Sequence, residues 1–92
     1  MTGNLPETVE RYSQSPVFDE TTIPAKLLSN HDLKAGVWGK ICVKKGMLEY
    51  VVPGQKDQIF NIGAGESLVV EPELVHFIKP IGEVRFQIEF FR

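Results

Sequence analysis

The sequence predicts an all-β protein built from short antiparallel strands. Turn-forming glycine, proline, asparagine and aspartate residues recur at intervals of roughly 8 to 12 residues, which is the spacing of strands in all-β domains. No segment keeps the 3.6-residue apolar period for the length of a typical helix, whereas several segments alternate apolar and polar residues. These features are typical of an antiparallel sandwich or barrel.

The length of the chain points to one domain. It has 92 residues, and a domain of this size buries only about two-thirds of the surface that its unfolded chain exposes. Hydrophobic residues make up 42% of the sequence, which is enough for a modest packed core and too much for a disordered chain. We expect residues 1–92 to form a single domain, with residues 1–7 as a loose N-terminal arm.

Charge and cysteine content argue against several classes of partner. Ten basic and twelve acidic residues leave a net charge of -2, and no basic run is long enough to follow a nucleic-acid backbone. Cys42 is the only cysteine, so no intramolecular disulfide can form. No apolar run approaches the ~20 residues that cross a membrane, and the first residues do not resemble a secretion signal. We expect a soluble, cytoplasmic protein that binds neither nucleic acid nor membrane.

Three short elements are expected in the first third of the chain. Residues 8–12 alternate weakly and predict an edge strand, and Val17 and Phe18 form a short apolar anchor. Residues 25–28 are apolar but too few to separate helix from strand. Strand is preferred for them because the neighbouring segments are strands.

The central stretch predicts a β-hairpin. Residues 36–43 alternate, with β-branched side chains on one face, as in a half-buried strand. Lys45 and Gly46 follow, and glycine tolerates the positive φ of a tight turn. Residues 47–52 resume the extended pattern and form the second strand of this hairpin.

Four further strands complete the predicted sheet. They cover residues 58–62, 67–70, 74–79 and 83–91, and glycine-containing turns are expected at 53–57, 63–65 and 80–82. In the last strand four apolar side chains share one face: Val84, Phe86, Ile88 and Phe90.

A set of residues spread along the chain resembles a known family. The set is His31, Lys34, Gly36, Trp38-Gly39-Lys40, Val43, Gly46, Leu48, Glu71-Pro72 and His76. In this order they resemble the small cupin-like domain at the N-terminus of tellurite-resistance protein B and its stand-alone relatives. The resemblance covers roughly residues 12–91. It implies a double-stranded β-helix, the cupin-like jelly-roll barrel, and a role in resistance to tellurite or in a related stress response.

The cupin resemblance also implies where metal ligands would lie. Counting back from Gly46 places Gly39 where cupins have a glutamate, and Leu33 and Ala35 where they have histidines. Of the usual ligands, only the histidine of the second half is kept, as His76. His31 lies two residues before the first missing histidine.

The candidate metal ligands are therefore His31 and His76, with Glu89 or Glu73 completing the shell. Imidazole and carboxylate suit a divalent transition metal such as zinc, iron or nickel. Each residue also has a simpler explanation. His76 shares the parity of Leu74 and Ile78 and could be a core histidine, and His31 could lie exposed in a loop. Glu89 could form an ion pair, and Glu73 could be a surface carboxylate.

A second group of candidates would contact a bound molecule. Trp38 and Tyr50 face each other across the predicted hairpin, either as a packing pair or as the wall of a pocket. Lys34 brings a positive charge that suits an oxyanion or a carboxylate, although most lysines are simply solvated. Cys42 is expected to be a buried, inert thiol.

Three functions are consistent with these residues. The first is a cupin-like binding protein for a small molecule, an oxyanion or a metal. The alternatives are a metal-dependent cupin enzyme, disfavoured by Leu33, Ala35 and Gly39, and a homodimeric interaction module without chemistry of its own. A methyltransferase would need a glycine-rich turn after a parallel strand, which these 92 residues lack. We expect a homodimer.

Overall fold

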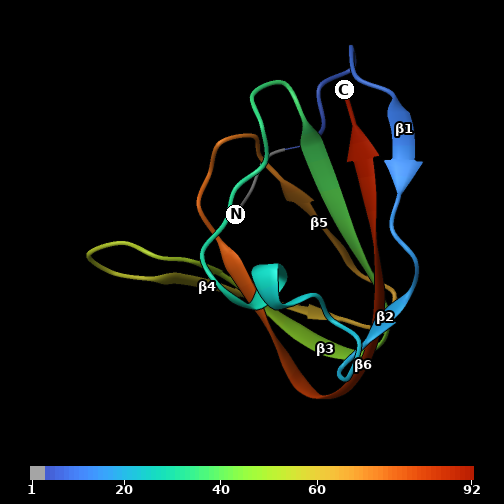
Figure 1. Cartoon of the computed structure of the whole chain (residues 1–92), viewed down its shortest axis with the longest axis vertical. Coiled ribbons are helices and arrows are strands. Elements are labelled where there is room, and N and C mark those ends of the chain that lie inside the picture. Colours follow the sequence, from blue (N-terminus) through green and yellow to red (C-terminus); the bar gives the residue numbers. More distant parts are fainter. Residues whose placement is uncertain (1–3) are drawn as a thin grey trace.

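Two long strands, β3 (Trp38–Val52) and β6 (Phe77–Phe91), form the centre of a single antiparallel sheet (Figure 1). Each has 15 residues, and they pair along most of their length, from Trp38 opposite Phe91 to Val51 opposite Phe77. The computed structural model describes residues 4–92. The first residues of the predicted N-terminal arm lie outside this range, whereas Leu5 and Pro6 are half-buried.

Four shorter strands flank this pair, and all pairings are antiparallel. They are β1 (Arg11–Gln14), β2 (Phe18–Asp19), β4 (Gln58–Gly63) and β5 (Ser67–Val70). The first two pair with β6, while β4 pairs with residues 47–52 of β3 and β5 pairs with residues 39–42. The strand order is β1-β6-β3-β4, with β2 and β5 attached to β6 and β3. The described chain is therefore all-β and nearly free of helix, as the sequence predicted.

The face of β3 that points inward changes at a bend in the middle of the strand. Its register to β6 shifts between Val43 and Met47. Before the bend the buried positions are odd-numbered, and after it Leu48 and Tyr50, which are even-numbered, are fully buried. Because of the bend, the two halves of β3 bury opposite faces of the strand in the same core.

Gly46 makes this bend possible. Its φ is +75°, a conformation that residues with a Cβ rarely adopt. A Cβ at this position would also collide with the backbone carbonyl oxygen of Glu83 on β6. Both the conformation and the close approach of the two strands require glycine here.

The predicted hairpin at Lys45 and Gly46 is therefore wrong, and so is the predicted turn at residues 80–82. Both segments lie inside continuous strands, β3 and β6. A glycine with positive φ serves a tight turn and a bulge equally well. Gly82, with φ +67°, lies in the corresponding part of β6.

Two early elements also differ from the prediction. Residues 25–28 form a 3₁₀ helix, η1 (Ala25–Leu28), rather than a strand, and the Leu27 amide donates to the Pro24 carbonyl at 2.9 Å. The first strand is Arg11–Gln14 instead of residues 8–12. Strands at residues 58–62 and 67–70 are confirmed by β4 and β5.

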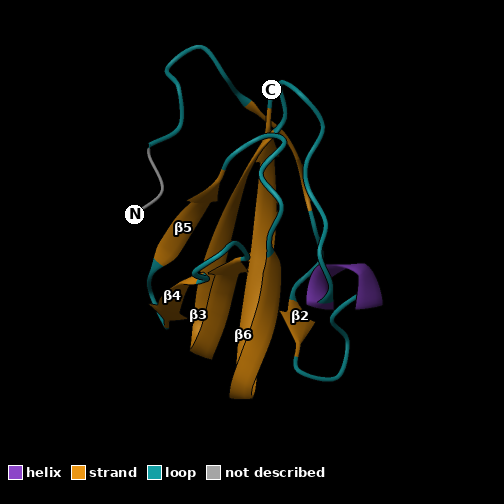
Figure 2. Ribbon diagram, turned by 90° about the vertical axis from the view of Figure 1, so that its left-hand side faces the viewer, coloured by secondary structure: helices purple, strands orange, loops and turns teal. Residues whose placement is uncertain are grey.

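The core is formed by apolar side chains of β3, β4, β5 and β6, and side chains from η1 and the loops beside it, such as Leu27 and Leu33, pack against it. Figure 2 shows η1 and its neighbouring loops on one side of the strands. The predicted apolar face of the last strand is confirmed: Val84, Phe86 and Ile88 are buried, and Phe90 packs against them. Phe18 on β2 packs on Phe86, with ring centroids 5.6 Å apart. Within the described residues, no helix has the length and apolar character needed to cross a bilayer.

Candidate functional site

The site is built on a two-residue bridge between His31 and His76. The His31 amide donates to the His76 carbonyl at 3.0 Å, and the His76 amide donates to the His31 carbonyl at 2.9 Å. This reciprocal pair ties the loop after η1 to the start of β6. It therefore fixes the position of both imidazoles through the backbone.

The two imidazole rings are in edge-to-face contact, with centroids 4.3 Å apart. Nδ1 of His76 lies 2.8 Å from the Leu74 carbonyl oxygen, and Nδ1 of His31 lies 3.2 Å from that of Ser29. A carbonyl can only accept a hydrogen bond, so Nδ1 carries the proton in each ring. In the neutral rings Nε2 is then the hydrogen-bond acceptor and the atom available to a metal.

Tyr50 continues this group of rings into the core. Its ring stacks on His76 at 5.0 Å, with 27° between the planes, and it is fully buried. Its hydroxyl oxygen is buried and has no hydrogen-bond partner among the described residues. Burial, together with the charge of Glu71, raises the pKa of Tyr50 to about 12. The phenol is therefore neutral throughout the physiological range.

His76 is held in its neutral form by its surroundings. Only 3% of the residue is exposed, as its parity with Ile78 predicted. Burial is the main cause that lowers the pKa of His76, and the neighbouring His31 lowers it further. The Leu74 carbonyl and the Asp32 carboxylate act in the opposite direction. A neutral imidazole can accept a hydrogen bond or ligate a metal.

A pocket of about 220 Å³ opens beside the two histidines. Its polar lining consists of Lys26, His31, Asp32 and His76. The rest of its lining is apolar and comprises Leu27, Leu33, Gly39, Ile41, Val70, Ile78, Ile88 and Phe90. An apolar cavity of roughly 150 Å³ is large enough to hold benzene. The pocket can therefore accommodate a small organic molecule.

Two of the lining residues occupy positions where the cupin resemblance implies metal ligands. Leu33 and Gly39 stand there in place of a histidine and a glutamate. A Cβ on Gly39 would lie 3.2 Å from the Leu33 side chain and 3.3 Å from Val70. This wall of the pocket is closely packed and carries no ligand atom.

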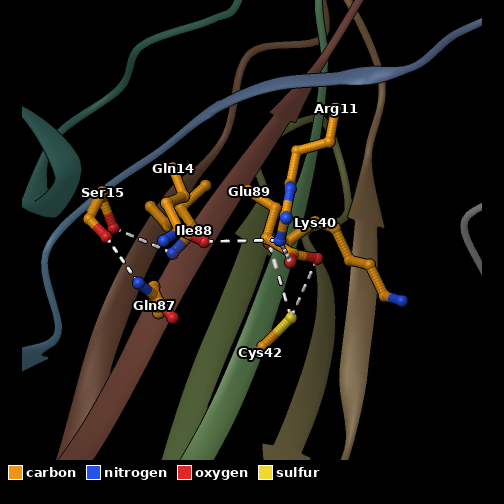
Figure 3. Close-up of polar contacts among 8 residues, drawn as sticks. All are labelled: Arg11, Gln14, Ser15, Lys40, Cys42, Gln87, Ile88 and Glu89. Carbon is orange, nitrogen blue, oxygen red and sulfur yellow. Dashed lines mark hydrogen bonds and ion pairs between the residues drawn. The ribbon is translucent and has the colours of Figure 1, made fainter.

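Glu89, a candidate metal ligand, lies on the opposite face of β6 from the pocket-lining Ile88. Its carboxylate forms an ion pair with Arg11 of β1 at 2.8 Å, as Figure 3 shows. The Cys42 thiol lies 3.8 Å from the other carboxylate oxygen. Burial raises the pKa of the Cys42 thiol, and the Glu89 charge raises it further. Glu89 therefore belongs to an ion-pair cluster outside the pocket.

The remaining candidates are also separated from the histidine pair. Glu73 is exposed, with φ +60°, and its amide donates to the Leu33 carbonyl at 2.8 Å. Within residues 4–92, no three histidine, cysteine, aspartate or glutamate side chains are grouped so that they could hold a metal ion. The four predicted ligands therefore do not converge. The structure brings His31 and His76 together and leaves Glu73 and Glu89 elsewhere.

The predicted ligand-binding residues do not converge either. Trp38 and Tyr50 lie near opposite ends of β3 because that strand is continuous, so the expected aromatic pair is wrong. Trp38 is opposite Phe91, and Tyr50 packs on Phe60 and His76. Lys34 is exposed in the loop before β3. None of the three predicted residues lines the pocket.

The family model of the TehB-like domain matches residues 13–88, which is most of the chain. The chain belongs to the TehB-like domain family. This membership agrees with the resemblance to tellurite-resistance protein B.

Curated relatives of this TehB-like domain are much longer proteins. The chain is 29% identical, over 76 residues, to the probable S-adenosyl-L-methionine-dependent methyltransferase TehB of Haemophilus influenzae (strain ATCC 51907 / DSM 11121 / KW20 / Rd). The protein of the same name from strain 10810 is 28% identical over 76 residues. In both cases the match covers 78% of this chain and 27% of the relative. The chain thus spans about a quarter of the length of these relatives.

Two crystal structures share the fold of this TehB-like domain. A protein from E. coli (strain K12) superposes with a TM-score of 0.88 at 26% identity, and the match covers 99% of this chain and 97% of that one. TehB from Haemophilus influenzae gives a TM-score of 0.79 at 24% identity, covering 92% of this chain and 32% of that one. The second comparison shows that the fold recurs within a longer protein.

Several residues that line the pocket of this TehB-like domain were not among the predicted site residues. Lys26 and Leu27 line it from η1, which was expected to be a strand. Asp32 lines it next to His31, and Phe90 does so from the end of β6. The apolar parity of the last strand was a usable signal for Phe90, since that face was already assigned to the core.

Proposed function

We propose that this TehB-like domain is a cupin-like binding module. In this proposal its pocket holds a small, largely apolar molecule whose polar head group donates hydrogen bonds to His31 and His76. The observation that carries it is the pocket lining, which is apolar except for two imidazoles and the Lys26 and Asp32 side chains. Such a site, with few polar groups in an apolar cavity, is typical of small-molecule binding.

The jelly-roll assignment is part of this proposal. It is supported by two observations. β3 and β6, with 15 residues each, pair along nearly their whole length, and β3 bends at Gly46. In cupin-like barrels the ligand lies inside the bent sheet, and the histidine pair lies on that side here.

Of the two expected ligand classes, the lining favours a neutral organic molecule over an oxyanion. Lys26 is the only lysine or arginine in the lining, and the Asp32 carboxylate offsets its charge. His76 is held neutral, so it contributes no positive charge near pH 7. A bare oxyanion would lose its hydration in an apolar pocket without enough compensating charge.

We also propose that the domain acts beside a methyltransferase in the response to tellurite or a related oxyanion. Its curated relatives, of which it spans about a quarter, are named probable S-adenosyl-L-methionine-dependent methyltransferases. The described residues form an antiparallel sheet around a small apolar pocket. A neutral organic methyl acceptor with an N–H or O–H donor would suit such a pocket, with methyl transfer carried out by a separate unit.

Binding of a probe tests the pocket. Benzamide has an apolar ring and an N–H donor group, and toluene has a ring of the same kind without a donor. We expect saturable benzamide binding in ligand-detected NMR, and binding at least about tenfold weaker for toluene or for the H76F variant, which keeps a ring but loses the acceptor.

A matched pair of variants separates filling of the pocket from general damage. Leu27 lines the pocket, whereas Leu28 is 45% exposed and does not. Leu27→Trp should abolish benzamide binding, while Leu28→Trp should leave it unchanged, with folding of both checked by urea denaturation. Equal binding by the two variants would contradict the proposed site.

A metal at the histidine pair is the second candidate function. The observation that favours it is that each Nδ1 engages a backbone carbonyl, which is how metal-binding histidines are commonly oriented for ligation through Nε2. The protein supplies two ligands, whereas catalytic zinc sites usually have three. Water or the bound molecule would have to complete the shell. Calorimetric titration with zinc, iron(II) or nickel should show binding that His31→Ala and His76→Ala both remove.

A further inference from the structure

The outer edge of β4 carries backbone groups without partners. The backbone N–H and C=O of Gly63 point away from β3. The amide donates to the Glu66 carboxylate at 2.6 Å, and the carbonyl accepts from the Glu66 amide at 3.0 Å. Alternate residues of a strand point their backbone groups to the same side, so those of Ile59 and Asn61 also point outward. Within residues 4–92, nothing accepts or donates a hydrogen bond at these four groups.

This edge lacks the features that protect the other edges of the sheet. β4 contains no charged residue and no proline, and Ile59 on it is 55% exposed. By contrast, β1 has an irregular register between Arg11 and Ser13, and β5 has four residues between Glu66 and Glu71. Charges, prolines, bulges and short strands are the usual means by which proteins prevent edge pairing. β4 has no charged residue, no proline and no bulge.

The hairpin that carries this edge is also accessible. In Figure 1 the turn that joins β3 to β4 projects from the rest of the molecule. Residues 53–59 are exposed or half-buried, so neighbouring parts of the chain do not cover the start of β4. A second strand can therefore approach it without rearrangement.

We infer that β4 pairs antiparallel with β4 of a second copy of this chain, about a two-fold axis at Phe60. Ile59 and Asn61 are placed symmetrically around Phe60, so each Ile59 faces Asn61 of the second copy. Two such pairs form, with two hydrogen bonds each. Together they satisfy the outward N–H and C=O groups of Ile59 and Asn61 in both copies. The edge is thus complementary to itself, which a two-fold interface requires.

Charge at the two ends of β4 fits the same arrangement. Lys56 precedes the strand and Glu66 follows it, so the two-fold axis brings each lysine near the other copy's glutamate. The Asp57 carboxylate accepts from the Gly54 amide at 3.1 Å and the Glu66 carboxylate from the Gly63 amide at 2.6 Å, so each carboxylate is held at its end of the strand. Opposite charges across an interface favour one register over its alternatives.

The interface meets the histidine site through the side chains on the inner face of the sheet. Phe60 packs on Tyr50, with ring centroids 6.2 Å apart, and Tyr50 stacks on His76. The two-fold axis therefore places the Phe60 side chains of both copies side by side. One row of rings then runs from each pocket to the dimer axis.

Sedimentation equilibrium of the whole chain tests this inference. From about 1 µM to about 200 µM we expect a monomer–dimer equilibrium. Asn61→Pro removes an outward amide but none of the hydrogen bonds to β3, and it should weaken the dimer about tenfold or more. Asn61→Ala keeps the amide and should leave the dimer intact.

A second pair of variants and a backbone measurement complete the test. Ile59→Lys should also weaken the dimer, whereas Val17→Lys, at a site that is 49% exposed on a different edge, should not. Hydrogen exchange of the Ile59 and Asn61 amides should slow as protein concentration rises. A monomer at every concentration would overturn the inference, and so would a dimer in which Asn61→Pro pairs normally and these amides exchange rapidly.

Discussion

His31 and His76 exchange both backbone hydrogen bonds, and their imidazoles lie in contact inside one wall of the pocket. The loop that carries His31 has no regular structure of its own after η1. This bridge and the hydrogen bond from the Glu73 amide to the Leu33 carbonyl hold the loop beside the start of β6. A change at either histidine side chain alters the pocket, whereas the bridge uses only backbone atoms, which every residue except proline provides in full.

The first prediction concerns acid stability. Because burial lowers the pKa of His76, the unfolded chain takes up a proton at a higher pH than the folded chain does. The contribution of His76 to the free energy of unfolding should thus be constant above about pH 7.5 and fall as the pH drops through the ordinary histidine value of 6.5. Urea denaturation with a chelator present measures this slope.

The H76F variant is the control for this slope. Phenylalanine keeps a ring against Tyr50 but has no proton to gain, so its stability should change less between pH 7.5 and pH 5 than that of the native chain. The same slope in both proteins would show that other groups cause the acid sensitivity.

The second prediction is that Tyr50→Phe does not destabilise the domain. The buried hydroxyl has no partner among the described residues, and an unsatisfied buried group costs free energy. We expect the variant to be as stable as the native chain or more stable by about 1 kcal/mol at pH 7. A loss of more than about 1 kcal/mol would reveal a hydrogen bond to water or to a bound molecule.

Tyr50 also predicts a loss of stability in alkali. Its pKa is raised from 10.0 to about 12, so the unfolded chain loses the proton first as the pH rises. The free energy of unfolding should fall between about pH 10 and pH 12, and Tyr50→Phe should make this fall smaller. Thermal unfolding followed by far-ultraviolet circular dichroism measures both proteins.

The third prediction tests the bend in β3. Gly46→Ala should destabilise by about 3 kcal/mol or more, because the Cβ adds a collision with Glu83 to an unfavourable φ. Gly82→Ala has a similar φ but open space around the Cβ, and should cost only about 1–2 kcal/mol. Equal losses in urea denaturation would mean that the collision is relieved by movement of β6.

The fourth prediction concerns the thiol in the ion-pair cluster. Burial and the Glu89 charge raise the pKa of Cys42, so little thiolate forms near pH 8. Cys42 should react with Ellman's reagent more slowly than a free thiol does. Glu89→Gln removes the charge and should accelerate the reaction severalfold, whereas Glu83→Gln on the same strand should not.

Much of the sheet could be predicted because strand alternation is a local property. The prediction that one face of residues 84–90 points inward was correct, because the alternation of side chains along a strand does not depend on which strand pairs with it. The continuity of β3 could not be predicted in the same way. Gly46 gives the same local signal in a turn and in a bulge, and only β6, which pairs with both halves of β3, distinguishes them.

The site was less predictable than the sheet because it depends on contacts between distant segments. The parity of His76 was enough to predict its burial. The placement of His31 beside it rests on a backbone bridge that no local pattern encodes. Glu89 follows Ile88 in the strand and therefore lies on the opposite face, which is consistent with its simpler explanation as an ion pair. Its partner Arg11 could not be predicted from the sequence.

The change of inward face at Gly46 makes the chain unequally tolerant of length changes. One residue inserted between Lys44 and Met47 would turn Leu48 and Tyr50 outward and expose their side chains to water. One residue inserted at positions 54–57 would only lengthen an exposed loop. Variation in length among proteins of this fold should therefore collect in the β3–β4 loop, while the spacing across the bend stays fixed.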